Sequence, residues 1–159
     1  MRKKTPFRVS IFMSHGTSLR TRALGYLARR EHSRLELERK LAPHAENPEE
    51  LSNVLDILEQ RGFLSARRMV DQVTHGRRSK FGSQRIVHEL REKGIDENLI
   101  AEALPGLKET ELDAARDVWR KKFGVMPTDA KERGRQVRFL MSRGFASDVI
   151  HKVLRRDDD

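Results

Sequence analysis

The side chains of this sequence that are best able to do chemistry are arginines and lysines gathered in short clusters. A guanidinium is planar and permanently charged, and its donors match phosphate and carboxylate oxygens in pairs, so such clusters favour anion binding. The candidate contacts for an anionic partner are Arg29, Arg30, Arg34, Arg67, Arg68, Arg77, Arg78, Lys80, Arg85, Arg120, Lys121, Lys122, Arg133, Arg135 and Arg138.

No motif for catalysis accompanies these clusters. The 6 histidines lack the spacing of a metal-binding helix, and with 0 cysteines there is no thiolate ligand or nucleophile. Phosphate-binding loops, nucleophile elbows and dinucleotide fingerprints are also missing from the sequence. The acidic pairs Glu49-Glu50 and Asp96-Glu97 begin expected helices, where the positive end of the helix dipole accounts for them. We therefore expect no enzymatic activity, no metal and no cofactor.

The charge of the chain points to an acidic or polyanionic partner. The formal net charge is +9 and the pI is about 10.3. Basic residues dominate 1–40, 61–93 and 119–156, whereas acidic residues dominate 41–60 and 94–118. Any single cluster could be a solvated helix face, but three basic blocks in one small chain favour an anionic surface as the partner.

No apolar run is long enough to cross a membrane. The first residues resemble a signal peptide superficially, but their apolar part is short and is interrupted by Arg8. We interpret residues 1–17 as a flexible basic N-terminal arm. The lack of cysteine is typical of a reducing compartment, so we expect a cytoplasmic protein without membrane contact.

Apolar residues recur at helical spacing along the rest of the chain, and no stretch alternates as a strand would. The sequence therefore predicts an all-α fold. Ser83 is expected to cap the helix that follows the basic stretch 77–80. Pro105-Gly106 is expected to end a helix, and Thr110 to cap the next one.

One short pattern occurs three times: a core leucine, a cation, a glycine and then a large apolar residue that should fill the corner. It covers 58–65, 90–96 and 140–147, with Phe63, Ile95 and Phe145 as the corner residues. We expect three tandem three-helix repeats in an elongated, curved body. The predicted segments are the arm 1–17, repeats 18–62, 63–106 and 107–156, and an acidic tail 157–159.

Aromatic residues are few and lie at expected core or corner positions. Tyr26 and Trp119 fall within helical patterns, while Phe63, Phe81 and Phe145 fall at turns. Contact with single-stranded DNA should then be weak, mainly electrostatic, non-specific in sequence and strongly dependent on salt.

Five stretches of the sequence form a recognisable series: segment 22–41, the Arg61-Gly62-Phe63 turn, and segments 77–95, 121–124 and 138–145. In these stretches the sequence resembles the RecX family of regulatory proteins, which modulate the RecA recombinase. The resemblance covers about residues 18–156, and the order and spacing of the stretches are more specific than any single motif.

This resemblance implies three tandem three-helix repeats without catalysis of their own. It also implies a negative regulator that binds the RecA–single-stranded DNA filament in its groove and blocks extension or promotes disassembly. RecA's ATPase, strand exchange and coprotease activities would fall as a result. We expect a monomer whose partners are the RecA filament and, more weakly, single-stranded DNA.

An autonomous helix-turn-helix DNA-binding protein is the alternative. The helix–glycine–helix corners and the basic charge favour it. Against it, the segments after the corners are poor in side chains that read bases, and two of them carry early acids, at Asp96-Glu97 and Asp148.

Overall fold

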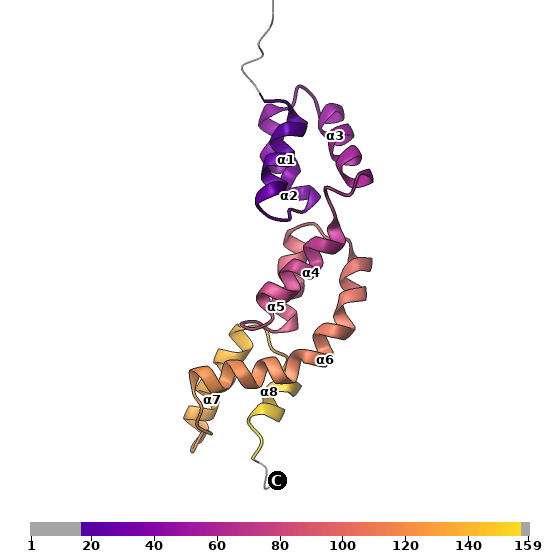
Figure 1. Ribbon diagram of the computed structural model, residues 1–159. Helices are drawn as coiled ribbons and strands as arrows, with labels where there is room; N and C mark the ends of the chain where they lie inside the picture. The colour runs from indigo at the N-terminus through magenta and orange to yellow at the C-terminus, as the bar shows by residue number, and fades with distance from the viewer. Residues whose placement is uncertain (1–16, 157–159) are drawn as a thin grey trace, which may run out of the picture.

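The computed structural model describes residues 17–156, and within this range the chain is helical with no strand (Figure 1). Apart from Thr17, the expected arm lies outside the described residues, as does the acidic tail. No helix in residues 17–156 is long and apolar enough to cross a membrane. The helices are α1 (Leu19–Arg29), α2 (Arg34–Leu41), η1 (Ala42–His44, a 3₁₀ turn), α3 (Pro48–Gln60), α4 (Ala66–Arg77), α5 (Ser83–Glu92), α6 (Glu97–Lys122), α7 (Ala130–Ser142) and α8 (Ser147–Val153).

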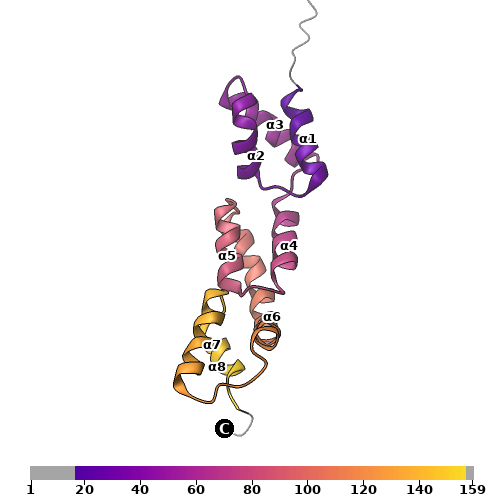
Figure 2. The same cartoon turned by 90° about the vertical axis from the view of Figure 1, so that its left-hand side faces the viewer.

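Three three-helix modules follow one another along an elongated, curved body (Figures 1 and 2). Module 1 is α1–α3, module 2 is α4, α5 and the first part of α6, and module 3 is the rest of α6 with α7 and α8. Each has its own buried apolar cluster, centred on Leu37 and Leu55, on Ile86 and Leu90, and on Leu140 and Ile150 respectively. The predicted fold class is confirmed. The exact repeat boundaries stay a prediction.

Capping residues explain where most of the helices begin. A side-chain oxygen accepts a backbone N–H of the first turn, which would otherwise lack a partner. This geometry is present at Ser18, Ser33, Asn47, Ser65 and Asp96.

Left-handed glycines end α3, α5 and α7, with φ of +77° at Gly62, +73° at Gly94 and +86° at Gly144. Ile95 and Phe145 fill the corners that follow, as predicted, and are 7% and 1% exposed. The expectation for Phe63 is wrong, because it is 48% exposed and Leu64 is buried in its place. The Phe63 and Leu64 N–H groups both donate to the Leu58 carbonyl, and this turn directs Leu64 into the core.

The predicted break at Pro105-Gly106 is also wrong, because α6 continues through Pro105 to Lys122. A proline removes one hydrogen bond and bends a helix rather than ending it when packing on both sides holds the helix together. Here Ile100 packs in module 2 and Val118 in module 3. Figure 1 shows α6 changing direction along its length. Thr110 therefore caps nothing, and its hydroxyl donates to the Gly106 carbonyl within the helix.

Modules 1 and 2 meet through ion pairs. The Glu36 carboxylate accepts from Lys93 Nζ at 2.6 Å and from Arg30 Nη1 at 2.8 Å. Arg68 adds a second link, with its Nε 2.8 Å from Glu31 Oε1. Burial alone would raise the pKa of the Glu36 carboxyl, but the hydrogen bonds from Lys93 and Arg30 outweigh it and hold that pKa below its usual value.

Modules 2 and 3 meet through a close backbone crossing. The Gly82 N–H donates to the Arg143 carbonyl at 2.8 Å, and the Gln84 N–H donates to the Gly144 carbonyl at 3.2 Å. A Cβ on Gly82 would collide with the Gly144 backbone, and one on Gly144 would lie 2.5 Å from Arg85 Cβ. Only glycines allow this approach.

A buried polar cluster lies beside this crossing and explains why Ser83 is not the predicted cap. Gly82 is the N-cap of α5 and Ser83 is its first residue. The Ser83 hydroxyl donates to the Glu111 carboxylate instead, and the Ser83 N–H donates to Glu111 Oε1 at 3.3 Å. Glu111 lies on α6 and is 4% exposed. From across the module boundary, its carboxylate therefore accepts hydrogen bonds from the first residue of α5.

Replacing Gly82 with alanine should lower the free energy of unfolding by about 1–3 kcal/mol, because the methyl group must push two backbones apart. The matched control is Gly76→Ala, since a Cβ there meets no atom within 4 Å. That change, within α4, should stabilise the chain by about 0.5–1 kcal/mol. Urea unfolding measures both. Equal effects of the two substitutions would contradict the close crossing.

Replacing Glu36 with glutamine should destabilise the chain by about 1–2 kcal/mol at neutral pH, because hydrogen bonds to a charged group are lost. A carboxyl whose pKa is lowered on folding contributes stability above its unfolded pKa, about 4.3, and loses it as pH falls through the folded pKa. The difference between wild type and Glu36→Gln should therefore shrink on acidification. Urea titrations at several pH values test this, with the exposed Glu109→Gln as control. A constant difference would argue against the ionic joint.

Candidate functional site

A continuous row of cations and aromatic rings runs across modules 2 and 3. The Arg85 and Arg143 guanidiniums lie 4.4 and 5.6 Å from the Phe81 ring centroid. Arg143 also lies 5.0 Å from the Phe139 centroid, and Lys122 Nζ lies 5.5 Å from it. We call this row the cation–aromatic surface; its members are Phe81, Arg85, Lys122, Phe123, Arg135, Phe139 and Arg143.

The far end of the row is held by a pair of rings. Phe123 packs edge-to-face on Phe139, with centroids 5.4 Å apart and planes at 88°. The Arg135 guanidinium lies 5.4 Å from the Phe123 centroid. Contacts of this kind contribute about 0.5–1 kcal/mol each at exposed sites, so they order these long side chains without burying their charge.

Several separate elements build this surface. Phe81 lies in the link between α4 and α5, and Arg85 is on the first turn of α5. Lys122 and Phe123 end α6, while Phe139 is on α7 and Arg143 follows it as its C-cap. The Gly82–Gly144 crossing brings the two modules together here. It is therefore the crossing that places Phe81 between Arg85 and Arg143.

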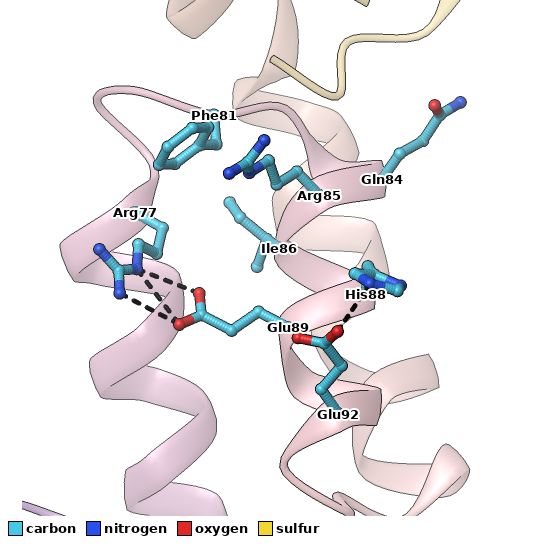
Figure 3. Close-up of a pocket in the computed structure, with 8 residues that line it drawn as sticks. All are labelled: Arg77, Phe81, Gln84, Arg85, Ile86, His88, Glu89 and Glu92. Atoms are coloured by element: carbon cyan, nitrogen blue, oxygen red, sulfur yellow. Dashed lines mark hydrogen bonds and ion pairs between the residues drawn. The ribbon is translucent and has the colours of Figure 1, made fainter. Parts of the chain in front are cut away.

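A groove continues from the surface along α4 and α5, with a volume of about 660 Å³. Figure 3 shows Phe81 and Arg85 at one end of it and the carboxylates of Glu89 and Glu92 further along. Arg77 is drawn towards Glu89, with its Nε 3.0 Å from Glu89 Oε2. The free positive charge therefore lies at the Phe81 end of the groove.

The chemistry of the cation–aromatic surface suits a single-stranded nucleic acid. Aromatic rings and guanidinium planes both stack on unpaired bases, while the charges attract phosphates. Phe81, Phe123 and Phe139 are half-buried, so each has an exposed part as well as a packed part. Arg85, Lys122 and Arg135 are exposed. The sequence-based interpretation treated Phe81 as a packing residue, whereas its half-buried ring also carries Arg85 and Arg143 at the surface.

Many of the candidate cations are occupied within the protein. Arg34 contacts Asp56 at 2.7 Å, Glu59 at 3.1 Å and Glu38 at 3.4 Å within module 1. The other candidates that form ion pairs with acids closer than 3.5 Å are Arg30, Arg67, Arg68, Arg77 and Arg120. These side chains mainly hold helices and modules together.

Arg78 is also structural. Its Nη2 donates to the Leu107 carbonyl at 2.8 Å and lies 3.9 Å from Glu111 Oε2, and its side chain is 15% exposed. Burial lowers the pKa of this guanidinium, and the nearby Glu111 carboxylate opposes that change. Arg78 thus neutralises Glu111 inside the joint between modules 2 and 3.

The remaining candidates keep more of their charge available. Arg85, Lys122 and Arg135 belong to the cation–aromatic surface, and Arg133 donates to the Leu154 carbonyl at 3.3 Å. Within residues 17–156, no salt bridge involves the exposed side chains of Arg29, Lys80, Lys121 and Arg138.

Sequence reasoning missed Arg143, Phe123 and Phe139 as members of the site. Arg143 was assigned only to the last turn of the repeat pattern, and the two phenylalanines fell in helical stretches. The available signal was local: aromatic residues directly beside cations, in Lys122-Phe123 and Arg138-Phe139. That adjacency did not reveal that Phe81, far away in the sequence, completes the row.

Comparison with known proteins places this architecture in a family. Residues 109–154 match the family description "RecX, third three-helix domain", and residues 67–104 match "RecX, second three-helix domain". The "Regulatory protein RecX" of Leptothrix cholodnii is 56% identical over 141 residues, which is 89% of this chain and 90% of that protein. The chain belongs to the RecX family.

Other relatives agree with this assignment. The "Regulatory protein RecX" of Chromobacterium violaceum is 46% identical over 92% of this chain and 96% of that protein. The crystal structure of RecX from Lactobacillus salivarius shares the fold, with a TM-score of 0.73 at 17% identity, covering 86% of this chain and 92% of that one. A second regulatory protein RecX structure gives a TM-score of 0.74. RecX proteins are regulatory proteins rather than a family of enzymes.

Removing the Arg78 side chain should separate its structural role from a binding role. Arg78→Ala should lower the free energy of unfolding by about 3 kcal/mol, because it leaves Glu111 buried without its cation. Arg85→Ala, seven residues further on in the exposed row, should cost less than about 1 kcal/mol. Thermal and urea unfolding measure both. If Arg78→Ala were as stable as Arg85→Ala, Arg78 would be a free surface cation.

Proposed function

We propose that this RecX-family chain is a negative regulator of RecA that binds the RecA–single-stranded DNA filament in its groove. It blocks filament extension or promotes disassembly, and so lowers RecA's ATPase, strand exchange and coprotease activities. The observation that carries the proposal is the cation–aromatic surface, which combines stacking rings with accessible charge on one side of an elongated body.

The shape of the molecule supports a long partner. Three modules in series present a surface much longer than one module, as a helical filament groove requires (Figure 2). The charge distribution supports it as well, because Asp56, Glu59 and Glu89 of modules 1 and 2 pair with arginines of their own module. Module 3 keeps exposed cations such as Lys122 and Arg135. In this proposal the DNA contact is weak and non-specific in sequence, and the chain acts as a monomer in the cytoplasm.

The test is a titration of this protein into RecA on single-stranded DNA with ATP, following ATP hydrolysis, beside a titration on the DNA alone. Inhibition well below RecA stoichiometry, at concentrations where naked DNA is barely bound, is the expected result. Inhibition that only follows DNA occupancy would indicate competition for the strand. Saturable, sequence-specific duplex binding without RecA would favour a helix-turn-helix DNA-binding protein instead.

A charge-reversal variant tests the surface itself. The triple variant Arg85→Glu/Lys122→Glu/Arg135→Glu should bind single-stranded DNA at least about tenfold more weakly. The slope of log K against log salt concentration should become shallower by about 2, because three phosphate contacts are lost. The matched control, Arg20→Glu/Arg39→Glu/Lys131→Glu, removes the same charge from exposed positions outside the surface. Equal losses in the two variants would show that only net charge matters.

A further inference from the structure

A second groove lies on the other side of α5, between modules 2 and 3, with a volume of about 610 Å³. Val87 of α5, Leu104 and Leu112 of α6, and Val149 of α8 line it with aliphatic side chains. The groove described above is lined by Arg85, Ile86 and Glu89, so the two grooves use different faces of the same helix.

The bend of α6 accounts for this groove. Leu104 packs against the core of module 2, whereas Leu112 and Val149 pack against the core of module 3. These three side chains remain half-buried, because no helix of the described chain covers the angle between the two modules. The floor is thus an apolar strip whose burial is incomplete, which is typical of a surface that binds a partner.

The rim of the groove is predominantly basic. Lys108 of α6 and Lys152 of α8 both line the groove and are exposed, and neither forms a salt bridge or hydrogen bond with any residue between 17 and 156. Arg91 adds a third charge, which it shares with Glu97 at 2.8 Å. Asp148 is the one exposed acid among the lining residues. Two available cations therefore accompany an aliphatic floor.

We propose that this groove binds an acidic segment of RecA that inserts at least one large apolar side chain against the aliphatic floor. The inference rests on the proposed function, because RecA is the partner in that proposal and the groove is assigned to one acidic segment of RecA. Carboxylates would pair with Lys108 and Lys152, and the apolar side chain would cover Leu104, Leu112 and Val149. Charge complementarity sets the orientation, while burial of the floor supplies most of the affinity.

The lining favours a protein segment over nucleic acid. Its floor is aliphatic and has no aromatic ring on which a base could stack, unlike the cation–aromatic surface. The two faces of α5 therefore divide the work, with single-stranded DNA on one and RecA on the other.

The experiment measures binding of RecA, without DNA or nucleotide, to the full chain labelled at its N-terminus, by fluorescence anisotropy. Lys108→Glu/Lys152→Glu should weaken RecA binding at least about tenfold, since two attractions become repulsions, and should leave single-strand binding within about twofold. Lys108→Arg/Lys152→Arg should restore RecA binding. The control Arg39→Glu/Lys131→Glu makes the same charge change elsewhere and should have little effect.

Val149→Thr tests the apolar floor, because it keeps the side-chain volume and adds a hydroxyl; it should also weaken RecA binding. Thermal unfolding of each variant verifies the fold. Unchanged RecA binding in the Lys108→Glu/Lys152→Glu variant would overturn the proposal. Equal losses of affinity for RecA and for single-stranded DNA in that variant would also overturn it, as would self-association of the wild-type chain through the groove. If the wild-type chain inhibited the filament ATPase but did not bind free RecA, the assignment of this groove to RecA would be overturned and the proposed function would stand. If the wild-type chain neither inhibited the ATPase nor bound RecA, the proposed function itself would be overturned.

Discussion

The joint between modules 2 and 3 is the constraint on which both candidate functional surfaces of this molecule depend. Gly82 and Gly144 let two backbones approach until the Gly82 N–H donates to the Arg143 carbonyl. Glu111 completes the joint by accepting from Ser83, and Arg78 compensates its buried charge. Burying such a carboxylate is costly unless it is hydrogen-bonded and paired, so the three side chains are stable only together.

This joint has two consequences for the surface. On one side of α5 it places Phe81 between Arg85 and Arg143 and starts the cation–aromatic surface. On the other side, the bend of α6 leaves an aliphatic groove whose lining also includes Lys108 and Lys152. The joint between modules 1 and 2 is different, since it is made of ion pairs around Glu36 near the surface. Such pairs are weakened by salt and acid far more than a packed backbone crossing.

The use of charge follows the same division. Arginines of modules 1 and 2 largely pair with acids of neighbouring helices, so a basic cluster in that part of the sequence stabilises helix packing instead of binding a partner. Lys122, Arg135 and Arg143 of module 3 instead lie over aromatic rings, which orders these side chains without neutralising them. An exposed ordered cation loses less entropy on binding than a free one, which supports the cation–aromatic surface as the anion site of the proposed function.

The sequence by itself determined the helices, the glycine corners and the repeated three-helix plan. These features depend on local physics: apolar spacing of 3.6 residues, caps such as Ser65 and Asn47, and positive φ at Gly62, Gly94 and Gly144. Its errors were also local, at Ser83, Pro105 and Phe63, where packing against a neighbouring module or turn overrode the usual preference.

The tertiary structure alone decided which cations are available. Arg77 and Arg85 look alike in the sequence, yet Glu89 engages the first while Phe81 supports the second. Likewise, Arg143 could not be assigned to the site until the chain crossing brought it beside Phe81 and Phe139. The physical reason is that helix formation depends on neighbours within a few residues, whereas the availability of a charge depends on contacts made by residues far away in the chain.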